Sequence, residues 1–405
     1  MDRQNLILIT EHFPCGHGEE ELETELLFLC QQFHVKIITL DYDAPLTRTL
    51  PQDVTFLRLP VEDRSGKFLR MLGHVFYPIW HREIRAARRH GRKVFSHYTA
   101  SLETIADAKY LADFIISQEE FSEDTPLVLY SYGLHPYTYG ICQAAKKRRE
   151  NLKTVLRIDT DHTPDYVPYE QAVNQYMDEI YLQNDRQRRY YMEKNDIVQN
   201  RSRYKICDIG VLAPQKQNPP QKDAGFHIIS HANITENSRY FQLVDALSRL
   251  DGIQISWTHI SSGKGLLTLK DYADEVFYYK PNISYHFDIS PTKQDIETIY
   301  TKSHLDFYLT LEPAPEERRS IVEAMSYGVY VVGINNGFLD GLVSNENGII
   351  LPSDIDAPML SKVLSMLQRV IPAEVEKKRQ AAFQTWDRHF NAEKVYPEFA
   401  RNISL

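Results

Sequence analysis

The stretch SIVEAMSYGVYVVGINNGFLDG, Ser320 to Gly341, decides the fold. Its first half has the spacing of an amphipathic helix, and the helix is expected to end at Gly328 because glycine readily takes the positive φ that stops one. The β-branched run that follows, 329–334, predicts a buried strand. Ligands of doubly wound α/β sheets collect outside the carboxyl ends of the strands, so the loop 335–337 is expected to border a binding site.

The chemistry of this segment suits a nucleotide. A carboxylate on the early turns of a helix can accept two hydrogen bonds from a ribose diol, while the amides at the helix start face a diphosphate. Glu323 is the candidate for the ribose, and Glu316 would line the same side of the pocket if the segment is helical throughout. The alternative is that Glu323 is an exposed helix residue without a ligand, because many α/β proteins contain helix-glycine-strand units.

Length and composition bound the class of protein. With 405 residues, of which 42% are hydrophobic, the chain is long enough for two domains that each bury a core. The net charge of −9 argues against general nucleic-acid binding. The first ten residues hold too short an apolar run for a signal peptide or a membrane span, so a cytoplasmic protein is expected. Four scattered cysteines indicate neither a disulfide framework nor a zinc site.

Both halves of the chain repeat a strand-helix-strand pattern. The first half opens with an apolar run at Leu6–Thr10, a turn containing Gly16 and Gly18, and a helix from Glu19. Glycines in the first turn let the backbone approach a ligand, although a simple tight turn explains them as well. The predicted divisions are a first domain at 1–211, a Pro- and Gln-rich linker at 212–224, a second domain at 225–385 and a final helix at 386–405 that packs back on the first domain.

The segment 66–93 interleaves aromatic and aliphatic residues with lysines and arginines, against the single carboxylate of Glu83. A basic, aromatic-rich pair of helices in an acidic protein is typical of peripheral contact with an anionic membrane surface. The alternative is two helices with an ordinary solvated face.

A polar sequence, Asp159-Thr160-Asp161-His162, follows the predicted strand 154–158. Two carboxylates one residue apart can hold a divalent metal on a nucleotide diphosphate. The commoner outcome is a polar loop at a strand end, from which Asp159 or His162 faces the cleft and acts on a bound hydroxyl.

Six segments in order carry a resemblance to a known family. They are FPCGHGEEELETEL (13–26), LRIDTDHTPDY (156–166), ISHANITENSR (229–239), SWTHISSG (256–263), SIVEAMSYG (320–328) and WDRHFNAEKVYPEFA (386–400). In this order and spacing the chain resembles bacterial glycosyltransferases of the retaining family 4, in particular those that build capsule, exopolysaccharide or lipopolysaccharide.

The resemblance implies an α/β protein of the GT-B fold, in which two Rossmann-like domains face each other across a cleft. It implies transfer of a sugar, with retention, from a nucleotide-sugar donor in the second domain to a hydroxyl of a glycan or lipid-linked glycan in the first, without a metal cofactor. The residues implied to bind the donor are Gly18, Ser230, Arg239, His259, Ser320 and Glu323. Those implied in the reaction are Glu19, Asp159, His162 and Glu316.

Three positions depart from the family pattern. Pro315 replaces the first of its two glutamates, Ser238 replaces a lysine that neighbours Arg239, and Asp159 replaces a histidine. Losing a cation at a diphosphate site removes stabilisation of the leaving group. The alternative function is therefore a catalytically silent GT-B protein that binds a nucleotide sugar or supports a partner transferase.

Overall fold

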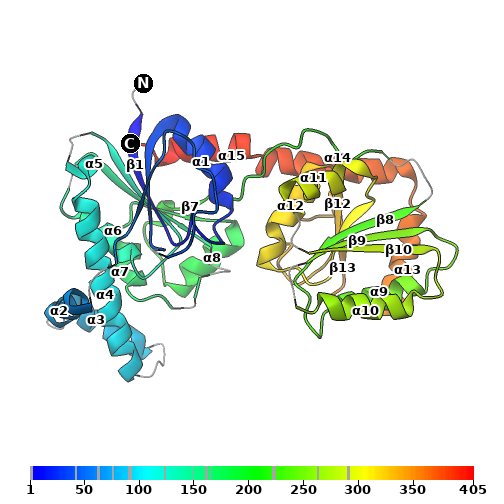
Figure 1. Cartoon of the computed structure of the whole chain (residues 1–405), viewed down its shortest axis with the longest axis horizontal. Helices are drawn as coiled ribbons and strands as arrows, with labels where there is room; N and C mark the ends of the chain where they lie inside the picture. The colour runs from blue at the N-terminus through cyan, green and yellow to red at the C-terminus, as the bar shows by residue number, and fades with distance from the viewer. Residues whose placement is uncertain are drawn as a thin grey trace. The chain divides into compact units, whose positions relative to one another are not determined.

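The structure is a computed structural model that describes residues 3–41, 43–61, 64–74, 77–89, 94–122, 125–148, 150–159, 163–164, 166–220, 225–261, 264–289 and 292–405. The chain divides into two compact units, each of which is described by itself. Unit 1 is Met1–Gly210 with Ala392–Leu405, and unit 2 is Val211–Asn391. Figure 1 shows a sheet with helices around it in each unit.

Unit 1 is built on a parallel sheet of seven strands in the order β3-β2-β1-β4-β5-β6-β7. The strands are β1 (Gln4–Thr10), β2 (Phe33–Thr39), β3 (Thr55–Arg58), β4 (Leu127–Tyr132), β5 (Leu152–Ile158), β6 (Glu179–Leu182) and β7 (Tyr204–Ile206). The chain winds in one direction from β1 to β3 and in the other from β4 onward. The switch point of this doubly wound sheet therefore lies between β1 and β4, which pair in parallel.

Helices cover both faces of the unit 1 sheet. They are α1 (Glu21–Gln32), α2 (Arg64–His74), α3 (Pro78–Arg89), α4 (Val94–Ile116), α5 (Glu119–Ser122), α6 (Thr138–Ala145), α7 (Glu170–Tyr176), α8 (Asp185–Lys194) and α15 (Ala392–Ile403), with a 3-10 turn, η1 (Arg201–Arg203). Alternate residues of β1 point to opposite faces. Leu6 and Leu8 pack with α1 and α15, whereas Ile7 and Ile9 pack with α4, α6 and α7.

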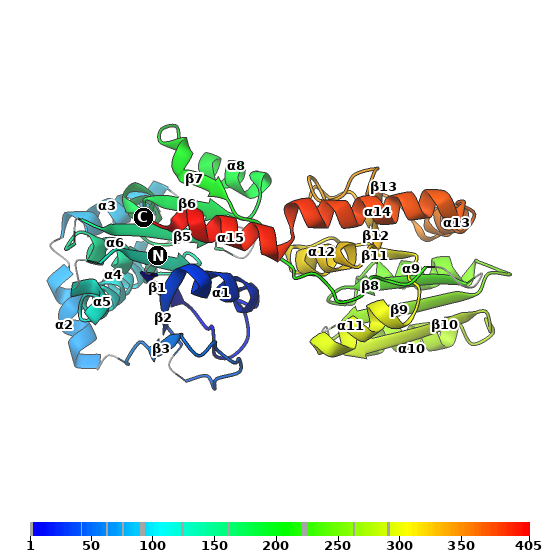
Figure 2. The same ribbon diagram turned by 90° about the horizontal axis from the view of Figure 1, so that it is seen from above.

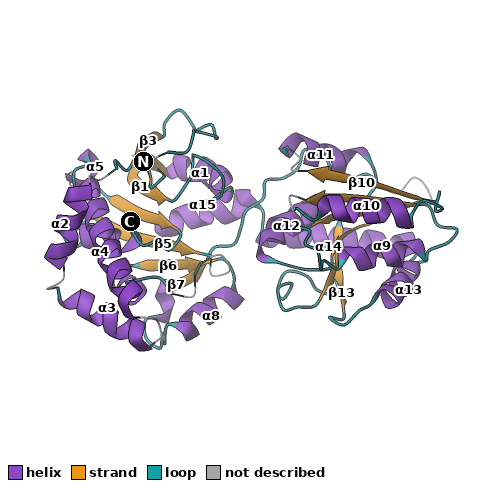
Figure 3. Cartoon of the chain, turned by 60° about the horizontal axis from the view of Figure 1, so that its bottom comes forward, coloured by secondary structure: helices purple, strands orange, loops and turns teal. Residues whose placement is uncertain are grey.

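Unit 2 repeats the same topology in a six-stranded parallel sheet, with the order β10-β9-β8-β11-β12-β13. Its elements are β8 (Phe226–His231), α9 (Tyr240–Ser248), β9 (Ile255–Ser261), α10 (Leu266–Val276), β10 (Ile283–Ile289), α11 (Lys293–Lys302), β11 (Phe307–Thr310), η2 (Pro315–Glu317), α12 (Arg318–Ser326), β12 (Tyr330–Ile334), β13 (Gly348–Leu351), α13 (Ala357–Gln368) and α14 (Pro372–His389). Figures 2 and 3 show α9 and α10 on one side of these strands, and α12 and α14 on the other.

The predicted linker, 212–224, is not a separate connector along its described part. Residues 211–220 belong to unit 2, where Asn218 is buried. The side-chain amide of Asn218 donates to the carbonyls of Tyr300 and Ser303, and Nη2 of Arg379 donates to its side-chain oxygen. The hydrogen bonds of Asn218 thus hold this segment against unit 2, although its Pro- and Gln-rich composition is typical of a linker.

The predicted final helix, 386–405, is two helices in different units. α14 ends at His389, and the indole of Trp386 donates to the carbonyl of Val211 within unit 2. Only α15 packs on unit 1, where the hydroxyl of Tyr396 accepts from the amide of Gly210 at 2.9 Å. The large apolar side chains at the carboxyl end therefore cover two separate surfaces.

Candidate functional site

The switch point of the unit 2 sheet lies between β8 and β11, and the loops that follow these strands meet there. The hydroxyl of Ser238 donates to Glu312 Oε2 over 2.6 Å, and the amide of Arg239 donates to Glu312 Oε1 over 2.9 Å. The carboxylate of Glu312 therefore holds the start of α9 against the loop after β11. The sequence offered no signal for Glu312, because the two loops are neighbours only in the fold.

Arg239, the residue implied to meet the diphosphate, immediately precedes α9. Its side chain is half-buried, and Nη2 donates to the carbonyl of Ser353, in the turn after β13, over 2.8 Å. A guanidinium has five N–H donors, so this one contact orients the group and leaves others for a ligand.

Ser320 lies in the first turn of α12, and its hydroxyl is 2.5 Å from Nδ1 of His231, the last residue of β8. Burial lowers the pKa of His231, so the ring is neutral at pH 7. The amides at the start of a helix carry its positive end and can bind an anion. The contact between Ser320 and His231 therefore links the start of α12 to the switch point. His231 was not among the residues named from the sequence.

Ser230 and His259 lie in the interior, on β8 and β9. Ser230 Oγ accepts from the indole of Trp257 at 2.8 Å and is 2.8 Å from Nδ1 of His259. Burial, with the nearby ring of His231, lowers the pKa of His259 to about 3, so this ring is neutral too. Both side chains are fully buried near the ends of their strands.

Glu323 occupies the second turn of α12 and is partly buried. Burial raises the pKa of its carboxyl, and the positive charges of Arg319 and Lys293 oppose the rise. Within the described part of the chain, no group is hydrogen-bonded to this carboxylate. Glu323 is therefore a half-desolvated acceptor, which is the condition expected of a group that pairs with a ligand.

The segment before α12 contains two further glutamates. Glu316 has its backbone in the 3-10 turn η2, and its side chain lies outside the described residues. The next residue, Glu317, is buried and accepts a hydrogen bond from the hydroxyl of Thr310 at the end of β11. Because η2 interrupts the helix, Glu316 and Glu323 are not two turns apart on one continuous α-helix.

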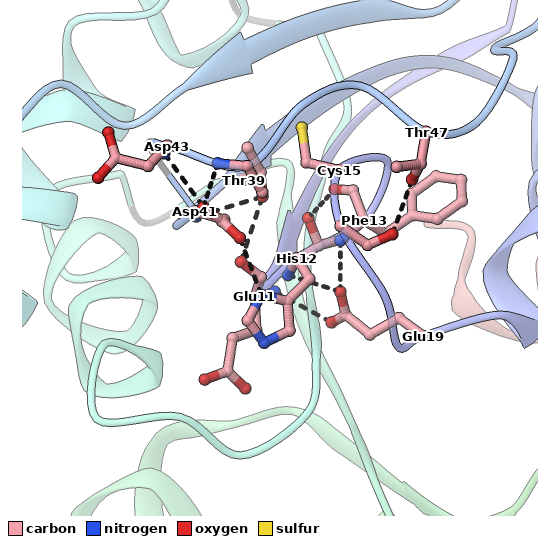
Figure 4. Close-up of polar contacts among 12 residues, drawn as sticks. Glu11, His12, Phe13, Cys15, Glu19, Thr39, Asp41, Asp43 and Thr47 are labelled. Atoms are coloured by element: carbon pink, nitrogen blue, oxygen red, sulfur yellow. Dashed lines mark hydrogen bonds and ion pairs between the residues drawn. The ribbon is translucent and has the colours of Figure 1, made fainter. Parts of the chain in front are cut away.

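In unit 1, Gly18 and Glu19 close the loop that follows β1. Gly18 has φ +99° and Glu19 has φ +53°, so α1 begins at Glu21 and not at Glu19 as predicted. The carboxylate of Glu19 accepts from the amides of Glu11 (3.0 Å), His12 (2.8 Å) and Phe13 (2.6 Å), as Figure 4 shows. Three amides occupy both carboxylate oxygens, so in this structure Glu19 braces the loop.

Asp159 directly follows β5, and its Oδ1 accepts from the side-chain amide of Gln187 over 2.7 Å. Its carbonyl accepts from the hydroxyl of Thr163. Asp161 and His162 lie outside the described residues, so the structure does not describe the D-x-D pair. Among the described residues no cluster of His, Cys, Asp or Glu side chains has the arrangement of a metal site.

No protein-family model matches the chain, and no curated protein matches it in sequence. Its structure is similar to a glycosyltransferase from Rickettsia africae, at a TM-score of 0.66 and 15% identity, covering 99% of this chain and 98% of that one. It is also similar to the lipopolysaccharide outer core galactosyltransferase WaaB, at 0.65 and 13%, covering 98% of both chains. A third is Anabaena HepE in complex with UDP and glucose, at 0.61 and 13%, covering 98% of this chain and 99% of that one.

At such low identities the likeness establishes the fold. The first two proteins are glycosyltransferases by name, and these structures have the GT-B fold. The two doubly wound parallel sheets of this chain follow the same plan, so the predicted GT-B fold class is confirmed.

Proposed function

We propose that the chain is a glycosyltransferase that transfers a sugar from a UDP-sugar to a hydroxyl group, with the donor bound at the switch point of unit 2. The observation that carries the proposal is Glu323, a half-desolvated carboxylate on α12 without a hydrogen-bond partner among the described residues. A ribose diol supplies the two donors that such a carboxylate needs. UDP is the nucleotide to test first, because HepE is similar in structure and carries UDP.

In this proposal Glu323 binds the ribose, while Arg239 and the start of α12 with Ser320 face the diphosphate. Helix amides and a guanidinium stabilise a leaving diphosphate without a metal ion, so no metal cofactor is needed. Retention of configuration, and the parts taken by Gly18, Asp159, His162 and Glu316, stay predictions from the resemblance.

The proposed acceptor is a glycan or a lipid-linked glycan, and the proposed role is assembly of a surface polysaccharide. It is supported by the resemblance of the sequence motifs and by the structural similarity to a lipopolysaccharide galactosyltransferase. The proposed location is the cytoplasm, at the inner face of the plasma membrane.

The proposal is tested by calorimetric titration of the purified protein with UDP, GDP, ADP, TDP and CMP in the presence of EDTA. We expect UDP to bind with a micromolar dissociation constant, and the matching UDP-sugars then to be consumed in the presence of acceptor glycans. Failure of all five nucleotides to bind contradicts a nucleotide-sugar site. Binding only after a divalent cation is restored contradicts the metal-free mechanism.

Glu312 favours a second candidate function, a silent GT-B protein that supports a partner transferase. Where the family carries a lysine, this chain has the hydroxyl of Ser238 hydrogen-bonded to a carboxylate. That arrangement places a negative charge next to the expected diphosphate, which weakens stabilisation of a leaving group. Tight UDP binding without any turnover of UDP-sugars is the result that favours this candidate.

We also propose that α2 and α3 contact an anionic membrane surface. No helix in the described ranges is long and apolar enough to cross a bilayer. On α2, Lys67 and Arg70 are paired with Asp107 and Asp113 of α4, and the apolar side chains of Phe68, Leu69 and Leu72 face solvent. On α3, Arg82 and Arg85 are exposed. Exposed apolar side chains on α2 and exposed cations on α3 are the two kinds of group that bind an interface of anionic lipid headgroups.

Sedimentation with lipid vesicles tests this contact. Wild-type protein is expected to sediment with vesicles rich in phosphatidylglycerol and not with phosphatidylcholine alone. Replacing Phe68, Leu69 and Leu72 with serine should abolish sedimentation, and Arg82→Glu with Arg85→Glu should do the same. The matched control replaces Tyr278 and Tyr279 with serine, because these two aromatics of unit 2 are even more exposed. Wild-type protein that stays in the supernatant refutes the contact.

A further inference from the structure

The switch point of unit 1 carries a histidine whose two ring nitrogens both face acceptors. Nε2 of His135 is 2.5 Å from the carbonyl oxygen of Tyr132, and Nδ1 is 3.4 Å from Oε2 of Glu11. A neutral imidazole has one N–H and can serve only one of them, whereas the protonated ring serves both. His135 is nearly fully buried beneath the loop that follows β1, and only its protonated form can donate to both acceptors.

The backbone of the loop after β4 leaves space for the ring of His135. A Cβ on Gly133, whose φ is +95°, would lie 2.5 Å from Cε1 of His135. The amide of His135 donates to the hydroxyl of Thr138, which also contacts the carbonyl of Gly133. Glycine leaves the room that the ring occupies, and Thr138 fixes the turn around it. The ring position is therefore set by the loop after β4.

Glu11 faces the histidine from the first residue after β1. Its backbone is held by the carboxylate of Glu19, whereas its own side chain is 55% exposed. The hydrogen bond from His135 lowers the pKa of Glu11, with further help from the charge of His12, although burial and Asp41 oppose the shift. Figure 4 shows the Glu11 side chain extending away from the braced loop. Glu11 is thus an oriented, ionised carboxylate that keeps acceptor capacity toward solvent.

The surrounding charges define what can bind there. His12 Nδ1 is 3.1 Å from Oδ2 of Asp41, so a second imidazole-carboxylate pair lies beside the first. With Glu19 the carboxylates outnumber the imidazoles, which disfavours a phosphate or another anion. Sugar hydroxyls carry no charge and donate hydrogen bonds to carboxylates. An uncharged polyol therefore suits the site.

We propose that Glu11 binds neighbouring hydroxyl groups of a pyranose ring in unit 1, and that His135 is the positioning residue that orients it. The site would hold the acceptor sugar. This inference rests on the proposed glycosyltransferase function. The carboxylate oxygens of Glu19, which the resemblance implies in the reaction, are occupied by amides, so Glu11 is the carboxylate of this loop that is proposed to bind a hydroxyl.

Saturation-transfer NMR with methyl glycosides of glucose, galactose, mannose and N-acetylglucosamine tests the site, with UDP at saturating concentration to fill unit 2. At least one sugar is expected to receive saturation from wild-type protein. Glu11→Gln should weaken its binding about tenfold, because a charged hydrogen-bond acceptor is replaced by a neutral one. Asp43→Asn is the matched control, since Asp43 is exposed and contacts Asp41 only through its backbone amide.

The results separate the inference from the proposed function. If UDP binds and none of the four sugars does, or if Glu11→Gln binds as wild type does, the acceptor site is wrong while the donor proposal stands. If neither UDP nor a sugar binds, both fail. Calorimetry of UDP with the Glu11→Gln variant should match wild type, which shows that unit 2 is intact. Hydrogen exchange of peptides that cover β1 and β4 should also match wild type, which shows that unit 1 is folded.

The role of His135 has its own readout in the pH dependence of sugar binding. Burial on its own lowers the pKa of His135, but Glu11, Glu19 and the carbonyl of Tyr132 raise it above 6.5. When the ring loses its Nδ1 proton, a lone pair faces Glu11 and the carboxylate is no longer held. Wild-type sugar binding should therefore weaken as pH rises through this raised pKa, and His135→Asn should abolish that dependence. A wild-type profile that is flat from pH 6 to about 9 overturns the positioning role.

Discussion

Replacing Arg157 with methionine is expected to lower the free energy of unfolding of unit 1 by about 3–5 kcal/mol. Arg157, on β5, donates to the carboxylate of Glu25 on α1, and both side chains are buried. The hydroxyl of Tyr130 donates to the other oxygen of Glu25 over 2.8 Å. Without the guanidinium, Glu25 is left as a buried charge with a single neutral donor.

The reason for so large an effect is desolvation. Burial raises the pKa of Glu25, and the charge of Arg157 is the main influence that opposes the rise. Removing one partner of a buried pair costs far more than the pair contributes relative to apolar residues. The double variant Glu25→Met with Arg157→Met should therefore regain most of the lost stability, with a remaining deficit because Tyr130 loses its acceptor.

Hydrogen exchange followed by mass spectrometry is the appropriate measurement, because a chain of two units need not unfold in one step. Peptides that cover β4 and β5 report on unit 1, and those that cover β11 and β12 report on unit 2. Arg3→Met provides the control, since Arg3 pairs with Asp53 at the surface over 3.1 Å and is expected to cost less than about 1 kcal/mol. An equal effect of the two arginine variants contradicts the argument.

The fold was accessible from the sequence because the long, periodic elements carry their own signal. The helix predicted to end at Gly328 contains α12, and the buried run at 329–334 contains β12. The short strands β3 and β13 were missed, because four residues at the edge of a sheet show too little periodicity. The final helix was predicted to start at 386, whereas α14 continues to His389 and α15 starts at Ala392, because apolar spacing continues through the break between the two helices.

The candidate sites were only partly accessible. Glu323 and Ser320 could be grouped from the sequence because they lie on one helix, and Arg239 could be named because it belongs to a local motif of the resemblance. Their roles as donor-binding residues stay predictions. Glu312 and His135 could not be named, because each meets a partner more than seventy residues away in sequence, at strands that the topology makes neighbours. Local patterns predict which residues share an element, whereas the strand order decides which loops meet.

Replacing Glu323 with alanine is expected to weaken UDP binding about 100-fold while the fold stays intact. Two hydrogen bonds from a ribose diol to a carboxylate contribute about 1.5–3 kcal/mol each, and even one of them at full strength corresponds to a tenfold to hundredfold change. The carboxylate has no hydrogen-bond partner in the described part of the chain, so its removal breaks no contact there that supports α12. Glu323→Gln, which keeps an acceptor without the charge, should lie between the alanine variant and wild type.

The same residue predicts the pH dependence of donor binding. The ionised form of Glu323 accepts both ribose hydrogen bonds, and burial raises the pKa of this carboxyl above 4.5. UDP affinity should therefore fall as pH decreases toward the raised pKa, at a higher pH than an exposed carboxylate would give, and Glu323→Gln should lose that dependence. Glu275→Ala, on the exposed face of α10, is the matched control in calorimetry. If the Glu323→Ala and Glu275→Ala variants bind UDP alike, the ribose is held elsewhere, and the assignment of the unit 2 site to α12 fails with it.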